Sequence, residues 1–532
     1  MNNLNNDNLN ILDLPDEILF IIFKKPNTID VFHLLVGVNQ QFDRLALDPL
    51  NVRDLDMTDI MIINSLYDKT PSIDTETLSK ICSKILPRIH RQVHKLTVEQ
   101  YSMKDILLAA NYSELYSLSL INFQAKILYQ YLRDSGDLIL RDLLTKQIMH
   151  LNIDIKRTTK RFSMTVSKIF ELIVSLCKNL TVLNFCDMFH TRTYETSVFY
   201  RSSNYMSSTL IKLKIHVLSL DDCLYLLDGR LDSLSTLIIN VEHIFDPKKL
   251  PKLKYLSFTT SNDSWQYDNL IVPLLCRMIN LEELKLFLLI KRFNSIYVDG
   301  IQLYNQFLIY MTQLKKFTFC INTEVYNEVT VELPSNEDIQ RSFIGRGYQQ
   351  VTSYVHTNSK IISQCLIYSL PYDFEYFVKI NNSFQGGMFD KVRQLKMSDG
   401  IPFEHKFFQL ISKDFPFLQF LNIYNYHPQN YKTHSSTLIT FPYLTFLDLR
   451  RAHVHYVKLF LLKNNAYLPR LSNLGIRYKS LTTITKNFTK DALDFNFGTL
   501  KSLDVCRSFI RPKNFHQYFP LLLVINKRKY FF

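Results

Sequence analysis

The chain has 532 residues, of which 47% are hydrophobic and 21% charged, and its formal net charge at pH 7 is +13. This composition excludes a disordered chain and leaves room for a small module beside a large core. The N-terminus MNNLNNDNLN is polar and lacks the apolar stretch of a signal peptide, and no apolar run approaches the length of a membrane span. The eight cysteines include no CxxC pair, which argues against a disulfide framework or zinc site and favours a reducing compartment, cytoplasmic or nuclear.

Residues 14–47 have the spacing of three short helices. Leu14-Pro15 followed by Asp16 and Glu17 is typical of a helix start, because proline suits the first turn and acidic side chains favour the positive end of the helix dipole. Thr28 or Asp30 is a suitable cap for a second helix. Helices of this size have too little core to fold alone, so part of their apolar surface is expected to meet a partner. The apolar residues at helical spacing are Ile18, Leu19, Ile22, Phe23, Val31, Leu34, Leu35, Val38, Phe42 and Leu45.

This segment resembles the F-box, whose members bind a Skp-type adaptor and through it a cullin-RING ubiquitin ligase. The resemblance is carried by Leu14, Pro15, Glu17, Ile18, Leu19, Ile22, Phe23, Leu34, Val38, Asn39, Phe42 and Leu45. Pro26 and Phe42 stand where the family usually has Leu and Trp, which leaves the strength of adaptor binding open. The alternative is a helical cap on the following domain. The adaptor-binding residues that the resemblance implies are Leu14, Pro15, Ile18, Leu19, Ile22, Phe23, Leu34, Leu35, Val38 and Phe42.

Beyond residue 50 the pattern LxxLxL, with other apolar residues replacing some leucines, recurs at spacings of roughly 19 to 33 residues. The last two apolar positions alternate with polar ones, as in a strand that buries one face. Stretches of helical periodicity, such as 104–110 and 453–462, return the chain to the next parallel strand. The repeats begin at Val93, Leu115, Ile148, Leu180, Leu210, Leu234, Leu253, Leu281, Leu314, Val392, Leu418, Leu444, Leu471 and Leu500.

These repeats resemble a degenerate leucine-rich-repeat array over about residues 90–510. They lack the regular Asn after the third apolar position, which favours an irregular arc over a regular horseshoe. The predicted fold class is therefore α/β, with a three-helix F-box followed by an irregular solenoid that has a parallel concave sheet. An ordinary α/β domain with unrelated strands is the alternative. The expected divisions are a polar disordered tail at 1–9, the F-box at 10–50, a helical connector at 51–90 and the solenoid at 91–532, with a divergent or inserted stretch at 320–391.

In such a solenoid the polar neighbours of the strand leucines, Asp448 among them, are expected to face solvent on the concave side. Aromatic residues and arginines are frequent there in the later repeats, and those residue types anchor protein interfaces. The candidates for a target-binding surface are Lys212, Lys214, Lys285, Phe420, Tyr424, Phe446, Arg450 and Arg477.

The chain has no recognisable catalytic motif, so no enzyme activity, cofactor or metal is expected. His90 and His94 form HxxxH, but the glutamate of a zinc protease is missing between them. Gly345 and Gly347 give a lone GxG without a third glycine.

The sequence therefore predicts a non-catalytic substrate receptor of an SCF-type ubiquitin ligase, with a Skp-type adaptor and an unidentified protein target as partners. A ligase-independent repeat scaffold and a basic nucleic-acid-binding solenoid are the alternatives. The net charge of +13 favours the latter, whereas the dispersal of Lys and Arg along the chain argues against it. No membrane partner is expected.

Overall fold

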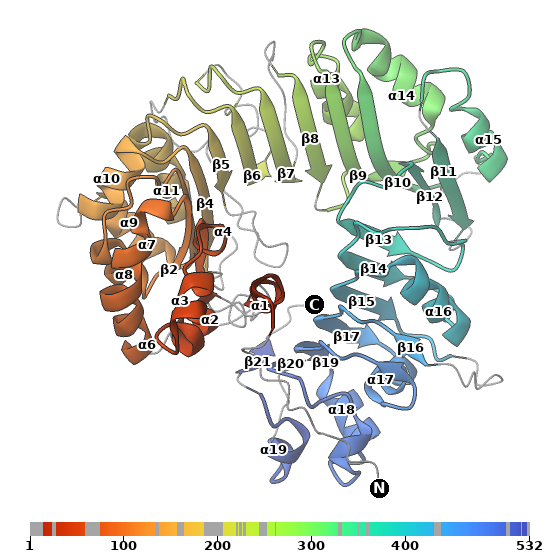
Figure 1. The fold of residues 1–532 in the computed structure, drawn as a ribbon. Coiled ribbons are helices and arrows are strands. Elements are labelled where there is room, and N and C mark those ends of the chain that lie inside the picture. Colours follow the sequence, from red (N-terminus) through yellow and green to blue (C-terminus); the bar gives the residue numbers. More distant parts are fainter. Residues whose placement is uncertain are drawn as a thin grey trace, which may run out of the picture. The chain divides into compact units, whose positions relative to one another are not determined.

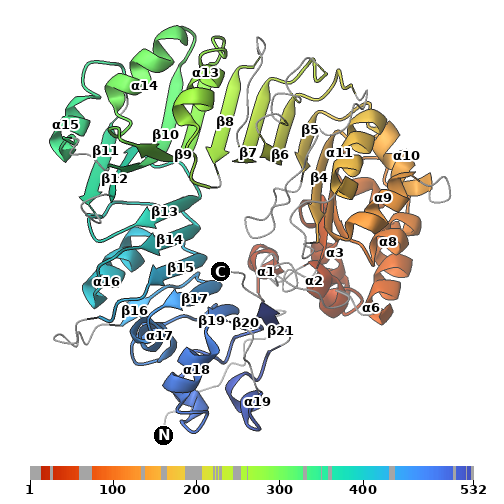
Figure 2. The same cartoon turned by 180° about the vertical axis from the view of Figure 1, so that it is seen from behind.

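The computed structural model is an α/β protein with a 12-stranded, mostly parallel sheet and a second, parallel sheet of seven strands (Figure 1; Figure 2). The chain divides into two compact units. Unit 1 comprises residues 1–262, 268–283 and 311–314, and unit 2 comprises 263–267, 284–310 and 315–532. The structure describes residues 14–23, 28–58, 75–133, 138–156, 164–185, 206–219, 222, 226, 230–243, 253–260, 262–327, 332–348, 350–357, 362–429, 438–506, 511–522 and 524–528.

The predicted helices of residues 14–47 are present, and we call residues 14–52 the N-terminal helical module. The carbonyl of Pro15 accepts the backbone N–H groups of Ile18 and Leu19, so the first helix starts where the sequence predicts. The side chain of Asn39 caps the third helix by accepting the N–H of Phe42 at 2.7 Å. The helices are α1 (Asp16–Phe23), α2 (Thr28–Leu35), α3 (Gln40–Ala46) and α4 (Pro49–Val52).

In unit 1 eight parallel strands follow one another in chain order. The second apolar residue of each repeat is aligned with its counterpart in the next strand, from Leu55 through Leu118 to Leu256, and every one of these leucines is buried. The strands are β1 (Asp54–Met57), β2 (Lys95–Glu99), β3 (Ser117–Phe123), β4 (His150–Ile155), β5 (Val182–Phe185), β6 (Lys212–Ser219), β7 (Thr236–His243) and β8 (Tyr255–Thr260).

Strand β1 lies in the stretch expected to be a purely helical connector. Val52, Leu55 and Met57 have the spacing of the repeat and are buried, so the sequence contained the signal for one more repeat than was predicted. Helices α8 to α11 lie on one side of β2 to β5 (Figure 1). The helices of unit 1 after the module are α6 (Thr75–Lys80), the π-helical turn at 81–85, α7 (Leu86–Ile89), α8 (Met103–Ala109), α9 (Ala125–Arg133), α10 (Leu138–Lys146), α11 (Met164–Leu176) and α13 (Val272–Leu275).

The stretch at 320–391, expected to be divergent or inserted, contains an antiparallel hairpin. Its strands extend the sheet in the order β10, β12, β11, so β11 forms the edge. This accounts for the gap in the repeat, because antiparallel strands need no helical return. The elements are β9 (Glu283–Phe293), α14 (Gly300–Gln306), β10 (Lys316–Tyr326), α15 (Asn336–Arg341), β11 (Val351–Thr357) and β12 (Ile362–Ser369).

The second sheet resumes the parallel pattern within unit 2. Phe377, Leu395, Leu421, Leu447 and Leu474 are aligned across neighbouring strands and buried. Helices α16 and α17 lie on one side of it (Figure 2). The elements are β13 (Tyr376–Ile380), β14 (Gln394–Ser398), α16 (His405–Asp414), β15 (Phe420–Asn425), β17 (Phe446–Ala452), α17 (Val454–Leu461), β19 (Asn473–Ile476), α18 (Tyr478–Thr485), β20 (Ser502–Cys506), α19 (Phe515–Tyr518) and β21 (Val524–Arg528), with a two-stranded pair β16 (Ile439–Thr440) and β18 (Ala466–Tyr467).

Polar side chains form hydrogen bonds with backbone groups in the turns after two of these strands, although no Asn stands at the position of the regular repeat. Asp399 and Asn425 lie two residues after the last apolar residue of β14 and β15. Asp399 accepts the N–H of Asn382 at 2.7 Å, and the Asn425 amide donates to the carbonyl of Ile401 at 2.6 Å. In a regular leucine-rich repeat the Asn lies three residues after the last apolar residue, so its role is filled here one position earlier in the repeat.

Among the helices of the described ranges, none is both long and apolar enough to cross a bilayer.

Candidate functional site

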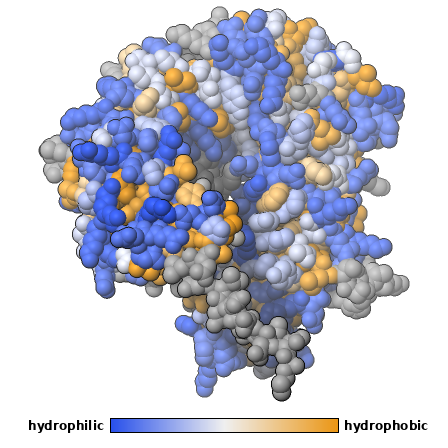
Figure 3. All heavy atoms as spheres, in the orientation of Figure 1, coloured by the Kyte–Doolittle hydropathy of each residue, from blue (hydrophilic) through white to orange (hydrophobic). Residues whose placement is uncertain are grey.

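The N-terminal helical module exposes large aliphatic side chains on α1, on α2 and in the turn after α2. The exposed fractions are 43% for Ile18, 55% for Ile21, 62% for Leu34 and 61% for Val38. Several exposed apolar side chains on so small a module are typical of a surface that a partner covers. Figure 3 shows hydrophobic residues reaching the surface in this part of the molecule. We call Ile18, Ile21, Leu34 and Val38 the apolar face of the module.

Other predicted adaptor contacts point inward. Leu19 and Phe42 are buried and form the small core of the module with Leu45, and Leu14, Ile22 and Leu35 pack half-buried against it. Leu19 and Phe42 therefore hold the helices together, which corrects the expectation that they contact an adaptor. Pro15 is exposed, and the side chain of Phe23 lies outside the described residues. The sequence analysis did not name Ile21, although it lies three residues after Ile18 and therefore on the same side of α1.

The module is also fastened to the chain that follows it. His33 Nδ1 lies 3.1 Å from the hydroxyl of Thr77 in α6, and Arg88 of α7 donates to the Asp43 carboxylate at 3.2 Å. Within the module, the Gln41 amide donates to Asp16 at 2.9 Å and thereby links α3 to α1. One side of the module therefore serves as a cap on unit 1, and the apolar face remains exposed.

The eight candidates for a target-binding surface do not form one site. Lys212, which is exposed, and Lys214, which is half-buried, lie on β6 in unit 1, whereas the other six belong to unit 2. Lys285 on β9 is already paired: its ammonium lies 3.2 Å from the Asp373 carboxylate and 4.7 Å from the ring centroid of Phe374. Lys285 therefore has a structural partner, and its contact with a target stays a prediction.

Phe420 and Phe446 stack on each other across β15 and β17. Their ring centroids lie 4.7 Å apart with an interplanar angle of 14°, and Phe446 is only 7% exposed. The pair offers little surface to a partner. This corrects the prediction for Phe446 and leaves Phe420 half-buried.

The guanidinium group of Arg450 is already bound within a network of buried charged residues. It donates to Asp448 on its own strand at 2.8 Å and to Asp504 on β20 at 2.7 Å, and Asn422 donates to Asp448 at 3.0 Å. Asp448 is 5% exposed, so the expectation that it faces solvent is wrong. A buried carboxylate requires such partners, and Arg450 therefore stabilises the sheet instead of presenting its charge to a target.

Tyr424 and Arg477 are joined by two residues that the sequence did not single out, Tyr426 and Arg451. The Arg451 guanidinium carbon lies 5.3 Å from the Tyr424 ring centroid, the two tyrosine rings meet edge to face at 5.3 Å, and the Arg477 guanidinium carbon lies 4.8 Å from the Tyr426 ring. We call these four residues the Arg–Tyr cluster. They gather where β15, β17 and β19 end, which spacing within one repeat could not reveal.

A similar stack lies where β14, β15, β17 and β19 begin. Arg393 lies 5.2 Å from the ring of Phe417, Phe417 and Tyr443 lie 5.4 Å apart, and Arg470 lies 4.8 Å from Tyr443. We call this set the Arg–Phe stack. Its members precede or follow the first apolar residue of successive repeats, so they follow the repeat spacing.

The described residues offer little for catalysis or metal binding. No group of three His, Cys, Asp or Glu residues among them is arranged to hold a metal ion. His90 and His94 each make a separate contact with a backbone carbonyl, of Asn111 and of Gln92.

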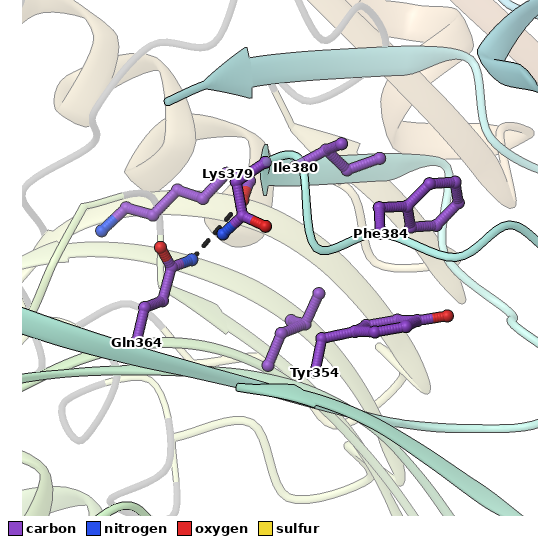
Figure 4. A pocket seen from close by; sticks show the side chains of 7 residues that line it. Tyr354, Gln364, Lys379, Ile380 and Phe384 are labelled. Atoms are coloured by element: carbon purple, nitrogen blue, oxygen red, sulfur yellow. Dashed lines mark hydrogen bonds between the residues drawn. The ribbon is translucent and has the colours of Figure 1, made fainter. Parts of the chain in front are cut away.

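A small cavity between β11, β12 and β13 has a volume of about 10 Å³, the space of roughly one water molecule. Its lining includes Tyr354 and Gln364, whose amide donates to the carbonyl of Lys379 at 3.4 Å (Figure 4). The cavity is too small for a substrate.

The chain matches no protein-family model and no curated protein.

Proposed function

We propose that the chain is a non-catalytic substrate receptor of an SCF-type cullin-RING ubiquitin ligase. The N-terminal helical module is then an F-box that binds a Skp-type adaptor, and the repeats form a leucine-rich-repeat-like solenoid that binds a protein target. The observation that carries the proposal is the apolar face of the module, four aliphatic side chains exposed by 43% to 62%.

The strand order supports the solenoid half of the proposal. In both sheets, parallel strands that follow one another along the chain align equivalent leucines, so each repeat buries its apolar side against its neighbours. Such arrays serve mainly as binding surfaces, because their strand faces present many side chains in a row.

The test is co-purification of the full chain with a Skp-type adaptor. The variant L34S/V38S removes two exposed aliphatic side chains from α2 and the turn after it, and we expect it to weaken adaptor binding about tenfold or more, since such side chains contribute about 1.5–3 kcal/mol each when fully buried. The matched control is I344S/L493S, which removes two aliphatic side chains of unit 2 that are exposed by 71% and 73%. Adaptor recovery that is equal for both variants would overturn the proposal.

Replacing Leu14 and Pro15 by Ala is expected to release the adaptor too, but it is a weaker test. Leu14 packs against the module core, so its loss also perturbs folding. Amide exchange of the module would separate the two effects.

A second candidate, a repeat scaffold that works without a ligase, is favoured by the contacts of His33 and Asp43 with Thr77 and Arg88. In that case the module is a cap, and the full chain would bind its target but recover no adaptor.

A further inference from the structure

We infer that the Arg–Tyr cluster binds an acidic, extended segment of a partner protein. The inference rests on the proposed function only in making that partner a target of the ligase; binding itself requires no adaptor. The cluster lies at the carboxyl ends of parallel strands, the edge at which ligands of parallel sheets commonly bind. Tyr424 and Tyr426 are 38% and 48% exposed, and Arg451 is exposed as well.

The cluster carries positive charge that the surrounding structure leaves uncompensated. Among the described residues, no carboxylate forms an ion pair with Arg451 or Arg477, and the buried carboxylates Asp448 and Asp504 bind Arg450 instead. Arg477 donates its Nε–H to the carbonyl of Arg450, which fixes the side chain, and no described residue accepts a hydrogen bond from its two terminal nitrogens. Guanidinium groups held in this way bind carboxylates through paired hydrogen bonds.

Neighbouring groups reinforce the positive potential. Burial, and then the charges of Lys458 and Arg477, lower the pKa of His453, which lies directly before α17. A protonated imidazole is therefore disfavoured there, first by burial and then by the positive charges nearby.

The geometry favours a peptide over a nucleic acid. Base recognition by single-strand binders requires open aromatic faces, but here a guanidinium covers one face of each tyrosine ring, and the rings meet edge to face. The three successive distances from Arg451 through Tyr424 and Tyr426 to Arg477 add up to about 15 Å, which is the length of four or five residues of extended chain. The rings of Tyr424 and Tyr426 stand between the two guanidinium groups in this series of contacts, and phenol hydroxyls can donate to carboxylates or backbone carbonyls.

The Arg–Phe stack provides a matched control. It has the same number of arginines on the same sheet, but Arg393 donates to the carbonyls of Asp390 and Val392, and only one of the two rings has a hydroxyl. Its capacity for anions is therefore lower.

The experiment measures fluorescence anisotropy of labelled peptides of about ten residues with the full chain at about 150 mM salt. One peptide alternates Glu and Asp with Gly and Ser, and its partner carries Gln and Asn in their place. We expect the acidic peptide to bind about tenfold or more tightly than the amide peptide, the variant R451Q/R477Q to lose about tenfold in affinity, and R393Q/R470Q to stay within about twofold. Thermal unfolding of both variants checks that the fold is retained.

Several outcomes would overturn the inference. Equal losses in the two variants would assign binding to the general field of a basic chain, and equal binding of the two peptides would exclude recognition of carboxylates. Tighter binding of an oligothymidine of equal charge would assign the cluster to nucleic acid. Adaptor co-purification of R451Q/R477Q is a separate readout, because the cluster lies in unit 2 and the module in unit 1. Loss of adaptor binding by the apolar-face variant is likewise independent of peptide affinity, so either proposal can fail alone.

Discussion

The contact between Arg450 and Asp504 requires a glycine, Gly475, on the strand that lies between them. Arg450 extends from β17 across β19 to reach Asp504 on β20, and it passes Gly475 on the way. A Cβ atom at Gly475 would lie 2.8 Å from Asp448 Oδ1 and 3.1 Å from Arg450 Nε. Glycine therefore makes room for the network that keeps both buried carboxylates paired.

The variant G475A should destabilise the protein by about 1–3 kcal/mol, because the added methyl group displaces Asp448 or Arg450 from partners they cannot replace inside the sheet. Urea unfolding measures the change. Gly498 is the control, since a Cβ atom there would meet nothing within 4 Å, and G498A should stay within about half a kcal/mol. Equal stability of G475A and the parent protein would mean that Arg450 does not cross β19.

Asp399 links stability to pH. Burial by itself would raise the pKa of Asp399, but hydrogen bonds from His356, Asn382 and Ile401 outweigh it and hold the pKa below its ordinary value. A lowered pKa in the folded state stabilises the fold at pH values above the unfolded pKa near 4, and this stabilisation is lost as the pH falls through the folded pKa.

We therefore expect D399N to lower the free energy of unfolding by about 1–3 kcal/mol at pH 7 and by less at pH 3, where the parent protein has itself lost part of the contribution. Urea titrations at both pH values test this. A difference between variant and parent that grows as the pH falls would contradict the assigned hydrogen bonds.

At the scale of single elements, the N-terminal helical module shows how burial divides residues that look alike in the sequence. Leu19 is fully buried against Phe42 and Leu45, whereas Leu34 is 62% exposed. Both leucines occupy helical positions within the same F-box-like pattern. Which of them faces inward is set by the contact between α1 and α3 and by the docking of α2 beside β1 and α6.

L19A should therefore melt the module, because it leaves a cavity that costs about 2–5 kcal/mol in a core of only a few side chains. L34A should leave the module folded, with a change within about half a kcal/mol. Amide exchange of residues 28–46 distinguishes the two variants. Similar loss of protection in both would mean that Leu34 belongs to the core and that the apolar face is not exposed.

For the whole molecule, the consequence of parallel strands in chain order is that stability is local. Each strand of the parallel sheets is hydrogen-bonded to strands close to it in the sequence, so a defect disturbs its neighbours most strongly. Leu118 in β3 and Leu447 in β17 are both fully buried, and they occupy equivalent positions in different sheets.

L118D should remove amide protection from β2 to β4 and spare β14 to β19, whereas L447D should do the reverse, because each introduces an unpaired charge into one part of the core. Hydrogen exchange with mass spectrometry reads both segments in one experiment. Loss of protection throughout the chain in both variants would show that the two sheets unfold as a single cooperative body.

Much of the fold follows from the sequence, and much less of the surface does. The spacing of the repeats predicted the parallel strands, including the alignment of Leu118 and Leu447 with their neighbours, but it missed β1 and β13 and gave no hint that the gap holds an antiparallel hairpin. Of the surface candidates in unit 2, Tyr424 and Arg477 lie in the Arg–Tyr cluster, whereas Lys285, Phe446 and Arg450 have structural partners.

There is a physical reason why the sequence predicts the fold better than it predicts the surface. Burial of one face of a strand repeats with the period of the strand, so the sequence by itself determined most of the parallel strands and which of their leucines enter the core. The pairing of Arg450 with a carboxylate 54 residues away, the meeting of Tyr426 with Arg477, and the exposure of Leu34 instead of Leu19 depend on strand register and on packing between elements. Those contacts join residues from different repeats, and only the tertiary structure decided them.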